Sequence, residues 1–331
     1  MAVPNNLTAA QWRSGDWLTG KRIRAYATIL LVIELAIFSF LVAGTHGWIV
    51  PLDKPNTTDF VSFYAAGALA DAGTPALAYD QSTHLAAEEA VVGKGIEYQY
   101  FNYPPVYQAL FAPIAYLPYL VAFILFEAAT LLLFLSVARR ILDDRSAIAL
   151  VVLLAFPMVW WNIGLGQNAF LTAGLFGAAT LLIDRRPIAA GLLFGALCYK
   201  PQFGLMVPVA LAAAGQWRAF AAAAVSAAGL VLASLALFGI ATWEAFLATV
   251  ASSHATYESG RILFNGMANT FGAARLLGAG PPFAYALQAM ASLVAAVVWR
   301  SSGAAICRCR RARRPSPPRL WSRHPWRSFT I

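Results

Sequence analysis

Charged residues are scarce in this sequence, and their scarcity excludes an ordinary soluble protein. Of the 331 residues, 12% are charged and 60% are hydrophobic, and the mean hydropathy is +0.62. Soluble domains carry about 25% charged residues. Apolar runs of about 20 residues, which is long enough to cross a bilayer, recur along the chain. The composition therefore predicts an all-α, polytopic membrane helical bundle.

Cysteine is also rare, with three residues in the chain. Cys198 lies within an apolar run, whereas Cys307 and Cys309 lie near the end. The spacing C-R-C is not that of a zinc site, and no second pair of cysteines follows it. We therefore expect neither disulfides nor a structural metal.

Acidic residues are absent from the last part of the chain. The net charge is +9, but Lys and Arg balance Asp and Glu as far as Trp299, and the excess comes from nine arginines between Arg300 and Arg327. The body of the protein therefore offers no basic surface for a nucleic acid. The basic segment 300–331 has two open explanations: a cytoplasmic tail that binds anionic lipid headgroups, or a stretch of a GC-rich gene translated out of frame. We favour the second explanation.

The positions of the basic residues predict the topology. Segment 1–24 is polar, and the apolar run 25–44 that follows it is too long for the hydrophobic part of a signal peptide. We expect an uncleaved first span with its N-terminus in the cytoplasm, because cytoplasmic loops carry the excess of Lys and Arg. The arginines that would then also be cytoplasmic are Arg139, Arg140, Arg145, Arg185, Arg186 and Arg218.

This topology divides the chain into three parts, which we place in the plasma membrane of a bacterium. They are a cytoplasmic N-terminal segment (1–24), a transmembrane domain (25–299) with a large outer loop at about 45–105, and the atypical basic tail (300–331). In the outer loop, the sequence from Asp59 onward and residues 82–93 favour amphipathic helices that lie in the membrane interface. The short apolar runs on either side of Lys200 favour broken helices that meet there and border a cavity.

Short polar motifs fall on the outer side in this topology. Asp59 belongs to a D-F motif in the first outer loop, and Tyr103 belongs to Y-P-P where this loop returns to the membrane. Gln167 and Asn168 form part of G-Q-N at an outer turn. Lys200 and Gln202 belong to the sequence Y-K-P-Q-F.

The order D-F, Y-P-P, G-Q-N and K-P resembles glycosyltransferase family 87, which comprises polyprenol-phosphate-mannose-dependent mannosyltransferases of the GT-C superfold. The resemblance covers residues 25–299 approximately. It implies an enzyme of the cell envelope that transfers a hexose, mannose above all, from a polyprenyl-phosphate carrier to a lipid or glycan acceptor on the extracytoplasmic side. Glucose and arabinofuranose donors also stay open. The chain has no D-x-D motif of the kind that holds a metal–nucleotide complex, which fits a metal-independent reaction without a cofactor.

The resemblance also implies roles for single residues. Asp59 occupies the position of the family's catalytic base, and a carboxylate can take the proton of an acceptor hydroxyl as the sugar is transferred. Lys200 is the first candidate for contact with the departing phosphate, and Arg261 is the second. The other candidate substrate-binding residues are Tyr103, Gln167, Asn168, Gln202 and His254.

Structural explanations of these residues stay open beside the functional ones. Asp59 follows two threonines before a helical pattern and could serve as a helix N-cap. Y-P-P is also typical of a helix start, G-Q-N of a polar turn, and Lys200 could extend to the interface. Glu34 and Glu127 lie inside expected spans, where an acid is a functional candidate but can also be explained by hydrogen bonding. As alternatives for the whole chain we keep a secondary transporter or lipid flippase, a membrane scaffold and an inactive truncated enzyme.

Overall fold

The computed structural model describes residues 19–43, 59–258 and 269–295, which are largely helical and contain no strand. The chain forms two compact units, Met1–Ala251 and Ser252–Ile331. In the second unit, α13 (Thr270–Leu276) and the helical residues 281–295 bury Phe271, Ala274 and Ala284 between them. The first unit holds most of the described helices and the candidate site.

Among the residues that the structure describes, three helices are long and apolar enough to cross a membrane: α2 (Gly20–Ala43), α6 (Tyr119–Ile141) and α12 (Trp217–Glu258). A fourth crossing is formed if α7 (Ala147–Leu154) and α8 (Pro157–Leu165), which are bent by 58° at their junction, act as one broken span. Pro157 begins α8, where a missing backbone N–H costs nothing. The expected all-α, polytopic membrane protein is confirmed.

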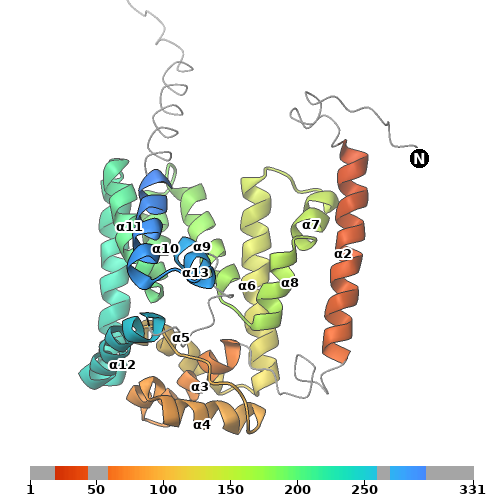
Figure 1. Cartoon of the computed structure of the whole chain (residues 1–331). Coiled ribbons are helices and arrows are strands. Elements are labelled where there is room, and N and C mark those ends of the chain that lie inside the picture. The colour runs from red at the N-terminus through yellow and green to blue at the C-terminus, as the bar shows by residue number, and fades with distance from the viewer. Residues whose placement is uncertain (1–18, 44–58, 259–268, 296–331) are drawn as a thin grey trace, which may run out of the picture. The chain divides into compact units, whose positions relative to one another are not determined.

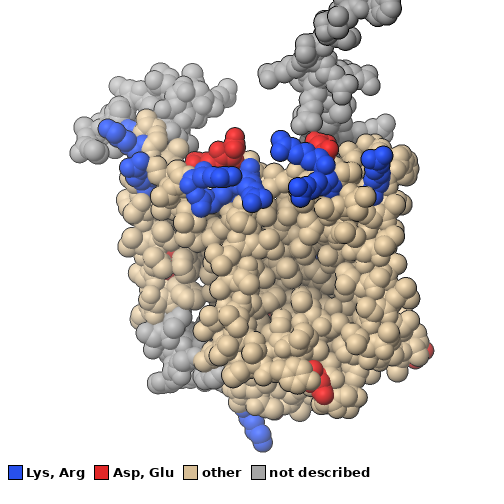
Figure 2. All heavy atoms as spheres, turned by 180° about the vertical axis from the view of Figure 1, so that it is seen from behind, with Lys and Arg blue, Asp and Glu red and all other residues tan. Residues whose placement is uncertain are grey.

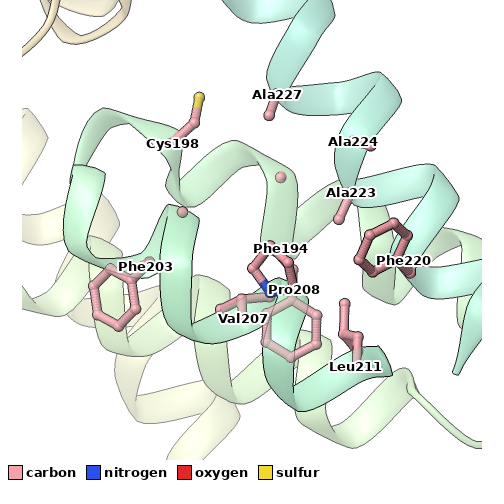
Figure 3. A pocket seen from close by; sticks show the side chains of 12 residues that line it. Phe194, Cys198, Phe203, Val207, Pro208, Leu211, Phe220, Ala223, Ala224 and Ala227 are labelled. Atoms are coloured by element: carbon pink, nitrogen blue, oxygen red, sulfur yellow. The ribbon is translucent and has the colours of Figure 1, made fainter. Parts of the chain in front are cut away.

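Shorter apolar helices fill the space between these spans. They are α9 (Ala169–Leu182), α10 (Pro187–Ala196), the 3₁₀ turn η2 (Leu197–Tyr199) and α11 (Pro201–Ala213). The apolar runs 187–199 and 201–213 thus meet at Lys200, as the sequence predicts. An apolar pocket of about 240 Å³ lies between α10, α11 and α12. Figure 3 shows Phe194, Phe203 and Phe220 among the side chains that line it.

The segment between α2 and α6 folds into a separate layer of short helices. These are α3 (Asp59–Asp71), η1 (Pro75–Tyr79), α4 (Gln81–Val92) and α5 (Pro105–Ala115). Asp80 caps α4, because its carboxylate accepts a hydrogen bond from the Thr83 backbone N–H at 2.9 Å. In Figure 1, α3, α4 and α5 lie at the end of the first unit opposite to the start of α2 and the α6–α7 connection.

Helix α3 forms where the sequence predicts a helix, but its environment differs from that of an amphipathic helix in the interface. The consecutive residues 60–63 are all buried, so α3 has no single exposed face at its N-terminal end. Phe60 and Phe63 pack against Phe111 of α5 with ring centroids 5.6 and 5.4 Å apart. Helix α3 is therefore part of an aromatic core, because α4, α5 and α6 cover the faces that the membrane interface would have covered.

The basic residues of the first unit gather at the ends of its helices. They lie at the start of α2, in the last turn of α6 (Arg139 and Arg140) and between α9 and α10 (Arg185 and Arg186). Figure 2 shows most of the Lys and Arg side chains on the visible face along one edge. The layer of α3, α4 and α5 lies at the opposite end.

Candidate active site

Asp59 and Gln167 are brought together at the start of α3. The side-chain amide of Gln167, in the turn between α8 and α9, donates a hydrogen bond to the Asp59 carboxylate. Both residues are half-buried. Burial raises the pKa of Asp59, and the hydrogen bond from Gln167 partly opposes this increase. In the described part of the chain this carboxylate accepts its hydrogen bond from Gln167, and not from a backbone N–H of its own helix as an N-cap would.

The turn that carries Gln167 packs directly on α3. Gly166 ends α8 with φ +63°, a left-handed conformation that favours glycine. A Cβ atom at this position would lie 2.5 Å from the Phe60 Cβ atom. Glycine therefore allows the turn to approach the backbone next to Asp59, and this approach brings the Gln167 side chain within reach of the carboxylate.

Asn162, which is buried in α8, holds the same turn from the other side. Its side-chain Nδ2 donates to the Gln167 carbonyl at 2.9 Å, and its Oδ1 accepts from the Ala169 N–H at 3.2 Å. Nδ2 also donates to Oε2 of Glu127, a buried residue in the middle of α6, at 3.3 Å. The turn with the G-Q-N motif is thus connected by hydrogen bonds to a membrane span.

Tyr103 and Asn168 lie beside this pair in an aromatic cluster. The Tyr103 ring packs against Phe63 with centroids 5.2 Å apart, and its backbone carbonyl accepts a hydrogen bond from Tyr79 at 2.9 Å. Burial raises the pKa of Tyr103 to about 12; the nearby Asn168 opposes this increase, and the negative charge of Asp59 adds to it. Asn168 is fully buried, and in the described residues neither of its side-chain amide atoms has a hydrogen-bond partner. Tyr103 is half-buried and is therefore more accessible than Asn168.

Lys200 joins the cluster through the residue before it. Tyr199 stacks on Tyr107 with centroids 5.0 Å apart and an interplanar angle of 19°, and its hydroxyl lies 2.8 Å from that of Thr172. Lys200 itself is half-buried, and burial lowers its pKa. Among the described residues it forms no ion pair, so its charge is available for an anionic ligand. Gln202 is exposed in the first turn of α11.

The remaining candidate residues stay predictions. His254 belongs to α12 within the second unit, and its side chain lies outside the described residues. Arg261 also lies outside them. Within the described ranges, no three His, Cys, Asp or Glu side chains are grouped closely enough to hold a metal ion.

A buried acid–base pair on α4 was not predicted from the sequence. His84 and Glu88 are both fully buried, with Nδ1 and Oε1 3.6 Å apart. The other imidazole nitrogen lies 3.1 Å from the Ser62 carbonyl of α3, and Glu88 Oε2 accepts from the Gln99 N–H at 3.2 Å. Burial raises the pKa of Glu88 to about 8, and the charge of Asp59 adds to this increase. Burial lowers the pKa of His84 to about 4. The spacing of four residues, which places both side chains on one helical face, is the signal that could have identified the pair.

The architecture defines a helical membrane protein, and this cluster is a candidate site centred on a carboxylate at one end of its helices. The chain matches glycosyltransferase family 87 over residues 101–324, which is more than half of its length. It therefore belongs to glycosyltransferase family 87 and is a membrane glycosyltransferase. Asp59 precedes the matched residues, whereas Tyr103, Gln167 and Lys200 lie within them, as does most of the basic tail. Comparisons with curated proteins and with solved structures give no match.

Proposed function

We propose that this glycosyltransferase moves a mannosyl unit from polyprenyl-phosphate-mannose to a hydroxyl group of a lipid or glycan acceptor, with Asp59 as the general base. The observation that carries the proposal is the half-buried Asp59 carboxylate, which receives a hydrogen bond from Gln167 in an aromatic setting. Such a carboxylate is oriented and partly shielded from water. It is suited to accept a proton from a hydroxyl group within hydrogen-bond distance.

The proposed reaction is a single displacement. The acceptor oxygen forms a bond to the anomeric carbon of mannose while the bond between that carbon and the phosphate oxygen breaks. The proton of the acceptor hydroxyl passes to Asp59, and polyprenyl phosphate leaves with the electron pair of the broken bond. Attack from the side opposite to the leaving group inverts the anomeric configuration.

The departing phosphate needs a positive charge or hydrogen-bond donors nearby. Lys200 is our first candidate because its ammonium has no ion-pair partner among the described residues and its neighbour Tyr199 packs in the aromatic cluster. Arg261, outside the described residues, is the second candidate. Tyr103 can donate a hydrogen bond from its hydroxyl group to a sugar or phosphate oxygen. Gln202 is exposed in the first turn of α11, next to Lys200, which is the N-cap residue of that helix.

We further propose that the site faces the extracytoplasmic side of a bacterial plasma membrane and that the N-terminus is cytoplasmic. Basic residues flank the start of α2 and the end of α6, and the layer that contains Asp59 lies at the opposite end of these helices. Because cytoplasmic loops carry an excess of Lys and Arg, we assign the end with the basic residues to the cytoplasm and the end with Asp59 to the opposite side. A lipid-linked donor also fits, because its headgroup can reach this end of the helices while its chain stays in the bilayer.

The test is transfer of labelled mannose from polyprenyl-phosphate-mannose in isolated membranes, measured for the wild type, Asp59→Asn and Asp71→Asn at equal expression. Asp71 is the matched control, because it ends the same helix α3 and is exposed. Loss of a general base reduces rates by about 10²- to 10⁴-fold. We expect this loss for Asp59→Asn, and near-wild-type transfer for Asp71→Asn.

Transfer that survives in Asp59→Asn would overturn the base assignment. Transfer from the corresponding glucose or arabinofuranose donor, but not from the mannose donor, would overturn the sugar assignment and leave the base assignment in place. Movement of the lipid-linked sugar across the membrane without transfer to an acceptor would favour a flippase.

A further inference from the structure

Asn162 makes more hydrogen bonds than the structure of its helix requires. Its backbone carbonyl accepts from the Gln167 N–H at 3.0 Å, which is an ordinary helix-ending bond. Its side chain then adds bonds to the Gln167 carbonyl and to the Ala169 N–H. Gln167 is therefore fixed by Asn162 at both its backbone N–H and its carbonyl, while its own side chain extends to Asp59.

Glu127 supplies the third bond to the Asn162 side chain. It is a buried acid in the span α6, where an ionisable residue is costly and needs a compensating role. Its Oε2 accepts from Asn162 Nδ2, and this bond favours the amide orientation in which Nδ2 also faces the Gln167 carbonyl and Oδ1 faces Ala169. Glu127 thereby selects one of the two orientations that the Asn162 amide could adopt.

If Glu127 and Asn162 served only to stabilise the helices, fewer polar groups would be needed. Helix α8 already ends at Gly166 with the positive φ that closes its last turn. An apolar side chain of similar size at position 127 would avoid the cost of a buried carboxyl, since replacement of buried polar pairs by apolar residues is often neutral or stabilising. The polar connection from α6 to the turn leads instead to the side chain that contacts Asp59.

We propose that Glu127 and Asn162 are positioning residues that hold the Gln167 amide against the Asp59 carboxylate. The catalytic importance of this positioning rests on the proposed function. The predicted effect on the pKa of Asp59 does not. When the hydrogen bonds of Glu127 and Asn162 are removed, the turn is no longer fixed, and the Gln167 side chain can move away from Asp59. The carboxylate then loses the donor that stabilises its ionised form, so its pKa rises.

The test is an infrared titration of the purified full-length protein, in which the carbonyl band of protonated Asp59 is identified by its absence from Asp59→Asn. The midpoint of this band is compared among the wild type, Glu127→Leu, Glu127→Gln and Asn162→Leu. Thr130→Val is the matched control, because Thr130 is buried one turn further along α6 and its hydroxyl bonds only to backbone carbonyls of that helix. Thermal unfolding of each variant identifies any that fail to fold.

We expect the Asp59 midpoint to shift to higher pH in Glu127→Leu and further in Asn162→Leu, which removes two additional bonds. Glu127→Gln keeps an oxygen that can accept from Asn162 and should restore the wild-type midpoint. The double variant should shift no further than Asn162→Leu alone, because both residues act through the same turn. Thr130→Val should leave the midpoint unchanged.

An unchanged midpoint in folded Glu127→Leu would overturn the proposal, as would an equal shift in Glu127→Gln. Because the titration needs no substrate, this result is independent of whether the donor or the base has been assigned correctly. Where transfer is measurable, kcat should fall by roughly 10- to 100-fold in Glu127→Leu with little change in KM, as expected for a small misplacement of reacting groups. Loss of transfer in Asp59→Asn together with a wild-type midpoint in Glu127→Leu would keep the proposed function and reject the positioning role.

Discussion

Gln167 donates its side-chain amide to the carboxylate of Asp59, and this bond joins residues that are 108 positions apart in the chain. The contact depends on the glycine before Gln167, because Gly166 touches the Cβ atom of Phe60 with no side chain between them. A turn between two apolar helices therefore contributes to the environment of an acid in the layer of short helices. The protonation of Asp59 is then a property of both segments.

Replacement of Gln167 by alanine should raise the pKa of Asp59, because the carboxylate loses a hydrogen bond while its burial is retained. The acidic limb of the pH–kcat profile should move to higher pH, since a larger fraction of the base is protonated at a given pH. Gln167→Glu should produce a larger shift in the same direction, because a second carboxylate beside Asp59 opposes its ionisation. The profile can be measured with the transfer assay, with exposed Gln81→Ala as the control. An acidic limb that stays in place in Gln167→Ala would contradict the prediction.

Replacement of Gly166 by alanine should destabilise the protein and reduce transfer. The left-handed conformation costs a non-glycine residue roughly 1–2 kcal/mol, and overpacking adds about 1–3 kcal/mol. The added Cβ atom would lie 2.5 Å from the Phe60 Cβ atom, so α3 and the turn must separate. Gly164→Ala is the matched control in the same helix, because its Cβ atom would meet nothing within 4 Å. Thermal unfolding in detergent should show a lower midpoint for Gly166→Ala only; equal midpoints for both variants would refute the packing argument.

The helices and their order were predictable from apolar runs, and so was the meeting of two short helices at Lys200. These features depend on local composition and on proline at the first helical position, as at Pro201. The environment of α3 was not predictable in the same way. Aromatic residues at 60, 63 and 64 fit both an interfacial helix and a core helix, and only the packing of α5 and α6 against Phe60 decides between them.

In the site, too, single residues were predictable from local sequence, whereas the contacts between them were not. The D-F and G-Q-N motifs identify Asp59 and Gln167 separately, but their hydrogen bond depends on a close approach at Gly166 that no local pattern encodes. Glu127 is conspicuous in the sequence as an acid in an apolar span, yet its partner Asn162 is an ordinary polar residue 35 positions away. Burial of Glu88 depends on the whole layer of short helices and therefore cannot be predicted from the sequence of α4 alone.

Replacement of Glu88 by glutamine should stabilise the protein increasingly as the pH rises. The pKa of Glu88 is raised from an ordinary value of 4.5 to about 8, so the folded state holds a proton that the unfolded state releases. The wild type therefore loses stability relative to Glu88→Gln between pH values of about 4.5 and about 8, and the difference stays constant above that range. Thermal midpoints across this interval measure the effect, and Glu97→Gln is the control because Glu97 is exposed in the segment that follows α4. A difference that is independent of pH would show that Glu88 is not protonated in the fold.

Removal of a hydroxyl group should affect the thermal midpoint differently at the two stacked tyrosines Tyr107 and Tyr199. The Tyr199 hydroxyl lies 2.8 Å from that of Thr172, whereas the buried Tyr107 hydroxyl lies near the Asn168 side chain but forms no hydrogen bond of good geometry among the described residues. Tyr199→Phe should therefore cost about 1 kcal/mol and lower the thermal midpoint, because it removes a hydrogen bond. Tyr107→Phe should leave the midpoint unchanged or raise it, because it removes an unsatisfied polar group from the core.

The two variants form a matched pair, because each loses one oxygen while the stacked rings, 5.0 Å apart, are retained. Thermal unfolding in detergent measures the stability difference, and the transfer assay measures any catalytic effect. A lower midpoint for Tyr107→Phe would mean that its hydroxyl has a stabilising partner in the folded protein. If Tyr107→Phe keeps its stability but loses transfer, the Tyr107 hydroxyl contacts the substrate in the bound state. Tyr107 would then join Tyr103 among the candidate substrate-binding residues.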